Sequence, residues 1–352
     1  MERFIGIDAH AQSCTFGVID AKGKQLRTDV VETNGESLVE YIRLIPGRRH
    51  LCIEEGMHSQ WLSEILSPHV HELAVVFAQK KSGNKSDALD AFGLAERIRS
   101  GSIGPKIFKA PKTFTPLRDW ARVYAMVTKD VVRTKNRIKS FYRSRGVRMP
   151  TRKEVFSPDG RSASLLSFKP STRKAIEVLC KQLDVLEEVK AETQEAMITQ
   201  ARKHAITKKL ETAPGLGPVR AAQLLAVVMS PHRFRTSRQF WAYCGLGIVM
   251  RSSADWLQTQ DGSWVKSDSA QTRGLNRNRN PIAKGIFKAA ATTVITQKHN
   301  NPLFEDYSRL LDRGTKPNLA KLTIARKIAA ITLAMWKNKE AYNPAKYRKQ
   351  IK

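Results

Sequence analysis

The sequence is poor in cysteine and has no long apolar run. Its four cysteines lie far apart in the chain and form no CxxC pair, so neither a thiolate zinc site nor a redox pair is indicated. No apolar run approaches the roughly 18 residues that a membrane span needs. The N-terminus MERFIGIDAH also lacks the basic and then apolar layout of a signal peptide. These absences predict a soluble cytoplasmic protein with reduced thiols.

Acidic residues are scarce in the later part of the chain. The 352 residues include 61 Lys and Arg against 32 Asp and Glu, which gives a net charge of +29. Residues 1–104 hold 12 basic and 14 acidic residues, whereas residues 105–352 hold 49 and 18, a net charge of +31. A surplus of this size favours a polyanion such as nucleic acid and makes its binding salt-dependent.

Short β-rich runs and amphipathic segments alternate over the first hundred residues. The run RFIGID and its successors predict strands at 3–8, 15–20, 25–32, 50–55 and 72–78. Apolar periodicity predicts helices at 36–45, 60–66 and 85–100. The order βββαβαβα describes an antiparallel meander followed by parallel crossovers, so we expect an α/β domain with a mixed sheet and helices on its faces.

From about residue 105 the sequence becomes helical. An apolar seam predicts one long basic helix over about 116–145, and a second is expected from about 172 to 210. We expect the two to pack as an antiparallel pair, with a parallel coiled coil as the alternative, and the segment 148–164 between them has loop composition. The predicted domains are therefore 1–104, a helical linker at 105–210, and a mostly α domain at 211–352.

Two aspartates, Asp87 and Asp90, begin the helix in KSDALDAFGLAERIRS. Carboxylates three residues apart on a helix repel each other by roughly a few tenths of a kcal/mol. A solvated first turn beside the positive end of the helix dipole would explain the pair without any function.

Two more carboxylates, Asp8 and Glu54, each follow an apolar strand segment. Ligands bind at the carboxyl ends of strands in α/β sheets, and these two strands are predicted neighbours. Four converging carboxylates suit two Mg²⁺ ions about 4 Å apart, acting on a phosphodiester. Glu55 is a rival for Glu54, and the choice depends on which side of the strand faces the core. His10 lies two residues after Asp8, and nothing in the sequence places it in the site.

The motifs GIDAH, CIEEG and NKSDALDAFGLAE, followed by a basic helical linker, PGLGP and AYCGL, are specific in their order and spacing. Together they resemble the DEDD transposases of bacterial insertion sequences, the bridge-RNA-guided recombinases, over nearly the whole chain. The resemblance implies a RuvC-like domain of the ribonuclease H fold, whose four acidic residues match Asp8, Glu54, Asp87 and Asp90. It also implies a C-terminal transposase domain with a catalytic serine shortly after the AxxGL motif.

Counting the family spacing from Gly245 points to Ser253 as that serine, with Ser252 as the runner-up. The usual Ser-Gly-Ser pattern is replaced here by RSSADW and a longer insert that carries Trp256 and Trp264. A serine hydroxyl needs a base or metal to take its proton and positive groups to stabilise phosphoryl charge. A pair of loop or N-cap serines is the alternative interpretation. Candidates for the positive groups are Arg251, Arg273, Arg277 and Arg279.

Two basic segments are candidates for nucleic-acid binding. In TRGLNRNRNPIAKGIFK, arginine can fork onto phosphates and asparagine can reach base edges, and Lys284 belongs to this run. Arg133 and Arg137, on the first long helix, would follow a phosphate backbone without reading sequence. A solvated charged face is possible for either segment. The PGLGPVRAA hairpin would either hold a phosphate on backbone N–H groups or serve as a plain helix–helix turn.

The resulting hypothesis is an insertion-sequence recombinase that cuts and rejoins DNA by Mg²⁺-assisted attack of Ser253, leaving a phosphoserine intermediate. The resemblance further implies a structured guide RNA that pairs with donor and target DNA, a homo-oligomer (dimer or tetramer), and a place at the bacterial nucleoid. One alternative is a resolvase-like endonuclease in which the carboxylates activate water. Another is a non-catalytic architectural binder whose acidic cluster is merely solvated.

Overall fold

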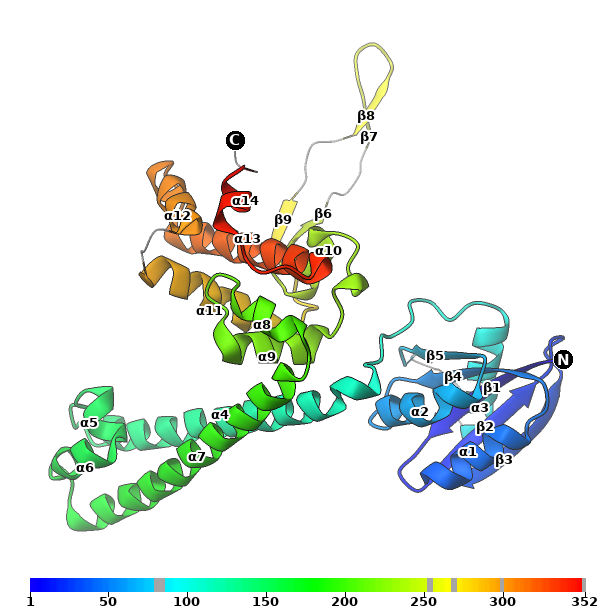
Figure 1. Cartoon of the computed structure of the whole chain (residues 1–352), viewed down its shortest axis with the longest axis horizontal. Coiled ribbons are helices and arrows are strands. Elements are labelled where there is room, and N and C mark those ends of the chain that lie inside the picture. Colours follow the sequence, from blue (N-terminus) through cyan, green and yellow to red (C-terminus); the bar gives the residue numbers. More distant parts are fainter. Residues whose placement is uncertain (79–85, 252–255, 267–270, 298–300, 350–352) are drawn as a thin grey trace. The chain divides into compact units, whose positions relative to one another are not determined.

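The computed structural model describes residues 1–78, 86–251, 256–266, 271–297 and 301–349, and it divides into two compact units, Met1–Thr115 and Pro116–Lys352 (Figure 1). Residues 105–115 pack with the first unit, where the Ile107 N–H donates to the Val75 carbonyl at 2.8 Å and Ala110 is buried. Among the described residues, no helix is long and apolar enough to cross a membrane.

A five-stranded mixed sheet forms the centre of the first unit. The strand order is β3-β2-β1-β4-β5, with β1 antiparallel to β2, β2 antiparallel to β3, and β1, β4 and β5 parallel. This confirms the predicted α/β class and the predicted neighbourhood of the first and fourth strands, and the order is that of a ribonuclease H-like sheet. The strands are β1 (Glu2–Ala9), β2 (Ser13–Ile19), β3 (Gln25–Glu32), β4 (Arg48–Glu54) and β5 (Glu72–Val76).

Helices cover both faces of this sheet (Figure 1). On one face, α1 (Gly35–Leu44) and α2 (Ser59–Leu66) bury Ile5 and Ile7 of β1. On the other, α3 (Asp87–Arg99) packs so closely that a Cβ added to Gly6 would lie 1.9 Å from the Ala91 carbonyl oxygen. Side chains alternate along a strand, so Asp8 shares the α3 face with Gly6. A short 3₁₀ helix, η1 (Ser67–His69), precedes β5, and another, η2 (Lys112–Phe114), follows α3.

The second unit begins with a long helical pair, α4 (Thr115–Ser144) and α7 (Pro170–Arg202). Ile138 of α4 and Ile176 of α7 belong to one buried apolar cluster, and the Lys135 ammonium pairs with the Glu187 carboxylate. Tyr124, near the start of α4, donates to Gln194 near the end of α7 at 3.4 Å. These contacts run in opposite directions along the two helices, which confirms the predicted antiparallel pair.

Two predictions about this pair were wrong. The segment 148–164, predicted as loop, contains α5 (Arg152–Phe156) and most of α6 (Pro158–Leu165), because a Thr151–Glu154 capping box starts α5 and Val155 and Leu165 are buried against the pair. The helix predicted to reach residue 210 ends at Arg202. The His204 N–H donates to the Ala201 carbonyl at 3.0 Å, a tight turn that separates α7 from α8 (Ile206–Glu211).

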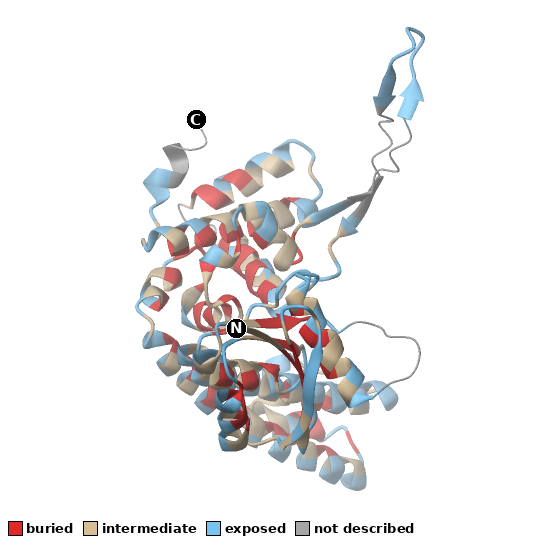
Figure 2. Ribbon diagram, turned by 90° about the vertical axis from the view of Figure 1, so that its right-hand side faces the viewer, coloured by how far each residue is buried: buried red, intermediate tan, exposed pale blue. Residues whose placement is uncertain are grey.

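The C-terminal part of the second unit is mostly helical, as predicted, with two β-ribbons between residues 248 and 275. The strand β6 (Ile248–Arg251) pairs with β9 (Gln271–Leu275), and β7 (Trp256–Gln258) pairs with β8 (Trp264–Lys266), both antiparallel. Buried residues concentrate between the helices, whereas residues 256–265 of the β7–β8 ribbon are exposed and coloured pale blue (Figure 2). The helical elements are α9 (Gly217–Val228), η3 (Pro231–Arg233), α10 (Ser237–Tyr243), α11 (Pro281–Gln297), α12 (Pro302–Asp312), α13 (Pro317–Asn338) and α14 (Pro344–Lys349).

Candidate functional site

Asp8 occupies the carboxyl end of β1, and its side chain is only 20% exposed. Burial raises the pKa of Asp8, the negative charges of Asp87 and Asp90 raise it further, and His10 opposes the shift. The structure thus places both helix aspartates within electrostatic reach of the strand aspartate. This is the convergence that the sequence predicted for three of the four carboxylates.

The start of α3 holds the two helix aspartates in place. Ser86 caps the helix, because its hydroxyl accepts from the Leu89 N–H at 3.3 Å, and the Asp90 N–H donates to the Ser86 carbonyl at 3.0 Å. Asp87 and Asp90 are therefore in the first turn, where the helix dipole favours negative charge. Close packing of α3 on Gly6 fixes this turn beside the end of β1.

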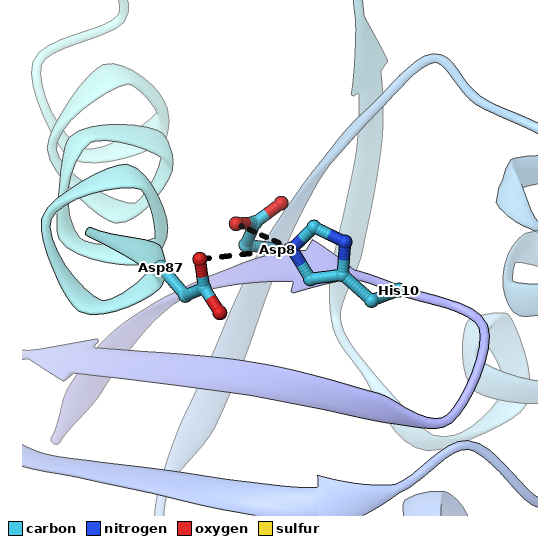
Figure 3. Close-up of side chains that lie close together, drawn as sticks. All are labelled: Asp8, His10 and Asp87. Carbon is cyan, nitrogen blue, oxygen red and sulfur yellow. Dashed lines mark ion pairs between the residues drawn. The ribbon is translucent and has the colours of Figure 1, made fainter. Parts of the chain in front are cut away.

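His10 joins the cluster, although it was not among the predicted site residues (Figure 3). Its Nε2 atom lies 3.3 Å from Asp8 Oδ2 and 3.7 Å from Asp87 Oδ1. Residues i and i+2 of an extended chain point to the same side, and the His10 N–H donates to the Ser13 carbonyl at 3.0 Å in the turn that follows β1. Strand alternation, applied two residues past Asp8, was the signal that would have found it.

Glu54 ends β4, directly beside β1. Ile53 packs in the core under α1 and α2, and Cys52 packs against α3, so alternation directs Glu54 to the α3 face that Asp8 also occupies. The rival Glu55 is engaged elsewhere, because it accepts from the Ser59 hydroxyl at 3.2 Å and pairs with Lys109. The geometry therefore favours Glu54 as the fourth carboxylate of the cluster.

The donor set of the cluster fits a divalent cation. One ligand atom each from Asp8, His10 and Asp87 lies within 4.8 Å of the others. Carboxylate oxygens suit Mg²⁺ or Mn²⁺, while an imidazole nitrogen is a more usual ligand of the later transition metals. Asp90 and Glu54 add carboxylates from the same side of the sheet. Between the unfavourably close carboxylates, a bound cation would replace repulsion with attraction.

The serines predicted as nucleophile, Ser253 and Ser252, lie outside the described residues. The structure does describe the strand directly before them, because β6 ends at Arg251, which pairs with Gln271 of β9. The Leu246 N–H donates to the Trp241 carbonyl at 2.8 Å, which closes the turn of the AYCGL motif after α10. Of Arg251 and Arg273 only the backbone is described, in β6 and β9 respectively.

The basic loop 276–280 packs against the same AYCGL turn. The Asn276 N–H donates to the Gly247 carbonyl at 3.0 Å, and the Asn280 N–H to the Tyr243 carbonyl at 2.8 Å. Gly245 has a φ of +64°, and a Cβ there would lie 2.0 Å from the side chain of Arg279, so the motif glycine makes room for this arginine. The structure therefore places the predicted nucleic-acid loop against the turn that precedes β6, the strand that leads into residues 252–255 with the two serines.

Positive charges gather around this loop. Arg277 and Arg279 are exposed, and Lys284 follows in the first turn of α11. Partial burial and the charges of Arg279 and Lys288 lower the pKa of Lys284. Like charges held this close are relieved when a phosphate binds among them, so the cluster suits an anionic backbone.

The other two basic candidates lie on α4. Arg133 and Arg137 are both exposed, and Arg133 donates to Asp130 at 2.8 Å, one turn earlier on the helix. An exposed pair of this kind contributes little to stability and is easily exchanged for a phosphate contact.

The PGLGP turn has a structural reason for its first glycine. Gly215 has a φ of +71°, and a Cβ there would lie 2.5 Å from the Ala290 carbonyl oxygen, so this turn packs directly on the backbone of α11. Arg220 also donates to the Gly215 carbonyl at 2.6 Å. These contacts favour the plain helix–helix turn at Gly215, whereas none of the described residues outside its own helix and chain neighbours has an atom within 4 Å of the Cβ position of Gly217.

Comparison with known protein families identifies the chain. Residues 5–144 match the family model of IS110-type DEDD transposases, and residues 207–309 match the model described as "Transposase IS116/IS110/IS902 family". Together the matches cover more than half of the chain. The chain belongs to the IS110 family of DEDD transposases. It is accordingly an enzyme that cuts and rejoins DNA, and the predicted family is confirmed. Among curated proteins, none matches the chain.

The first match covers all the acidic residues of the cluster, and the second covers the AYCGL turn, the ribbons and the basic loop. The DEDD name of the family refers to four acidic residues, and the cluster around Asp8 supplies an acidic group of the kind that binds metal. DNA is therefore a partner of this IS110-family transposase.

Proposed function

We propose that this transposase cuts DNA by attack of Ser253 on a phosphodiester, with Asp8, Glu54, Asp87 and Asp90 holding Mg²⁺. The observation that carries the proposal is the convergence of Asp8, His10 and Asp87, with ligand atoms within 4.8 Å of one another, at the end of β1 in a DEDD-family domain. Because carboxylates and DNA phosphates are both negative, an acidic cluster repels DNA unless a cation is bound between them. The cluster is therefore best explained as a metal site.

The proposed chemical step is a transesterification. The Ser253 Oγ forms a bond to phosphorus and loses its proton to a base, while the bond from phosphorus to the leaving sugar oxygen breaks and that oxygen gains a proton. Bound Mg²⁺ would neutralise charge on the phosphoryl oxygens. The number of phosphoester bonds is unchanged, so the phosphoserine stores the energy needed to rejoin the strand.

The chain's own basic groups supply binding and orientation. Arg277 and Arg279 lie on the loop that packs against the AYCGL turn, Lys284 follows in the first turn of α11, and each can hold a phosphate oxygen. Arg251 is the last residue of β6, directly before the serine segment (residues 252–255), and Arg273 lies in β9, the strand that pairs with β6. Arg133 and Arg137 on α4 would hold a nucleic-acid backbone without reading its sequence.

We further propose that a structured guide RNA, paired with donor and target DNA, directs the reaction and that the active enzyme is a homo-oligomer. The net charge of +31 in residues 105–352 supports binding of more than one nucleic-acid strand. Expression with the native flanking DNA, followed by sequencing of RNA that purifies with the protein, tests this. A discrete transcript from the flanks is expected, and only degraded bulk RNA would contradict it.

The metal and the nucleophile are tested by cleavage of donor and target DNA with matched variants. Glu54→Gln is expected to lower Mg²⁺-dependent cleavage by at least about 100-fold. Glu55→Gln changes the next residue, whose side chain points to the other side of the sheet. It is expected to keep the rate of Mg²⁺-dependent cleavage within a few-fold of the unchanged protein. Ser253→Ala should remove both strand cleavage and the covalent protein–DNA adduct, while Ser252→Ala should keep both.

Two other results point to the alternatives. Strand cleavage by Ser253→Ala without any adduct would show water attack, as in a resolvase-like endonuclease. Full function in Asp8→Asn, with no dependence on Mg²⁺, would show that the acidic cluster is not catalytic at all.

A further inference from the structure

The β7–β8 hairpin carries large apolar side chains that are exposed to water on both of its faces. Trp256 is 57% exposed and Trp264 61%, while Leu257 is 60% and Val265 50% exposed. The register pairs Leu257 with Val265 and Gln258 with Trp264, so the two tryptophans share one face and the two aliphatic residues share the other. Scattered single apolar residues are normal on a surface, but four on one short ribbon indicate a contact with another molecule.

The turn makes this hairpin a well-defined element. The Gly262 N–H donates to the Thr259 carbonyl at 2.9 Å, the Thr259 N–H donates to the Ser263 carbonyl at 2.8 Å, and Gly262 has a φ of +83°. This is a type I turn followed by a glycine bulge, a standard closure of a hairpin. The Asp261 carboxylate accepts from the Ser263 hydroxyl at 2.8 Å and from the Thr259 hydroxyl, which ties the turn together.

Charge indicates what the hairpin contacts. Residues 256–266 contain one acidic residue, Asp261, and one basic residue, Lys266, so the segment is neutral within a region that carries +31. A phosphate backbone requires basic side chains, and aliphatic residues on the second face offer nothing to a stacked base. Two copies of the chain, in contrast, repel each other over most of this region and can approach at a neutral surface.

The backbone at the edge of β7 is ready to pair. Because Thr259 and Ser263 share a ladder hydrogen bond, alternation makes Leu257 and Val265 the next bonded pair, and the N–H and C=O groups of Trp256 and Gln258 point away from β8. The strand Trp-Leu-Gln has no charge and no proline, the features by which edge strands usually avoid pairing. A two-stranded ribbon alone is also marginally stable, so an added strand would stabilise it.

We propose that β7 pairs antiparallel with β7 of a second copy of this chain around a twofold axis at Leu257. In this register Trp256 of one copy lies opposite Gln258 of the other, and their outward N–H and C=O groups make four hydrogen bonds. The result is a four-stranded sheet with four tryptophans on one face and the aliphatic residues on the other. The same strand is its own complement, as a twofold contact requires. The proposal is independent of the proposed chemistry.

Disulfide trapping tests the register directly. Leu257 of one copy would lie opposite Leu257 of the other in a non-hydrogen-bonded pair, with their Cα atoms about 4.5 Å apart. This distance is within the range of a disulfide. Leu257→Cys is therefore expected to form covalent dimers under mild oxidation of nuclease-treated protein. The four native cysteines are buried and provide a low background. Val265→Cys is the matched control. Val265 lies on the outer strand of each copy in the proposed sheet, so the two introduced cysteines would be about three strand spacings, or about 14 Å, apart.

A second pair of variants tests the backbone edge. Adding Gln258→Pro to Leu257→Cys removes one outward N–H but no ladder bond within the hairpin, and it is expected to reduce cross-linking at least about 10-fold. Gln258→Thr also loses the amide side chain but keeps the N–H, and it should cross-link as before. Equal cross-linking of the Leu257→Cys and Val265→Cys proteins would overturn the proposal. No cross-linking, together with quenching of hairpin tryptophan fluorescence by an oligonucleotide, would assign the hairpin to nucleic acid instead.

Discussion

Replacing Gly6 with alanine tests whether the packing of α3 on β1 sets the geometry of the acidic cluster. A Cβ at this position would lie 1.9 Å from the Ala91 carbonyl oxygen and 2.7 Å from the Ala95 amide nitrogen. Contacts between heavy atoms are ordinarily about 3.5 Å, so α3 has to move away from β1 by about 1.5 Å. The same helix carries Asp87 and Asp90, so the displacement reaches the carboxylates that face Asp8.

The magnitude follows from two separate costs. Forcing an extra methyl group into a packed contact costs about 1–3 kcal/mol of unfolding free energy. Moving catalytic groups by about 1 Å can lower a rate by about 100-fold. We therefore expect Gly6→Ala to lower the free energy of unfolding, measured by urea denaturation, by about 1–3 kcal/mol. We expect Mg²⁺-dependent formation of the protein–DNA adduct to slow by about 100-fold.

A matched substitution in the same unit separates these effects from a general sensitivity to alanine. Gly35 begins α1, and among the described residues a Cβ there would meet the Trp61 ring alone, at 3.9 Å, an ordinary contact. Gly35→Ala should leave both stability and cleavage within experimental error. Normal adduct formation by a folded Gly6→Ala protein would refute the reasoning, because it would show that the cluster works without the observed approach of α3.

Two further predictions concern charge. Burial and the Asp29 carboxylate raise the pKa of Tyr41 from 10.0 to about 12, so its neutral form stabilises the native state below pH 10 and that contribution is lost as the pH rises through about 12. Tyr41→Phe should remove a phenol that ionises near pH 12 in an absorbance titration, and an unchanged titration would contradict this. Partial burial, and then the charges of Arg279 and Lys288, lower the pKa of Lys284. Because a phosphate would relieve the repulsion among these charges, Lys284→Gln should weaken nucleic-acid binding and reduce the slope of log affinity against log salt by about 1; an unchanged slope in fluorescence anisotropy would exclude a phosphate contact.

The sheet was predictable because its signals are local. Apolar alternation and turn residues gave the strands of the first unit, and their order required only the rule that consecutive crossovers are parallel. The choice between Glu54 and Glu55 was open in the sequence, because the two residues point to opposite faces of the sheet and the sequence does not say which face Ile53 shares with the acidic cluster. It became decidable once the structure showed Ile53 under α1 and α2 and Cys52 against α3.

The errors have physical causes in tertiary packing. The segment 148–164 is polar and contains proline and glycine, so its composition hides α5 and α6, although the Thr151–Glu154 capping box was present in the sequence. The break after Arg202 contains neither glycine nor proline. It is set by the turn at His204 and by the Thr207 hydroxyl, which donates to the Ala201 carbonyl in the buried interior. Such a break depends on contacts that periodicity does not record.

The separation of charge along this chain has a consequence for how DNA binding and cleavage depend on metal. Residues 105–352, with a net charge of +31, can bind DNA without any cation, and their affinity should fall with salt. The cluster around Asp8 repels a phosphodiester, because it brings the negative charges of Asp87 and Asp90 to a carboxyl group whose pKa is raised by burial and then further by these two charges. Removing Mg²⁺ should therefore abolish cleavage while leaving most of the DNA affinity of the full chain. A loss of affinity as large as the loss of cleavage would mean that the acidic cluster, and not the basic region, holds the DNA.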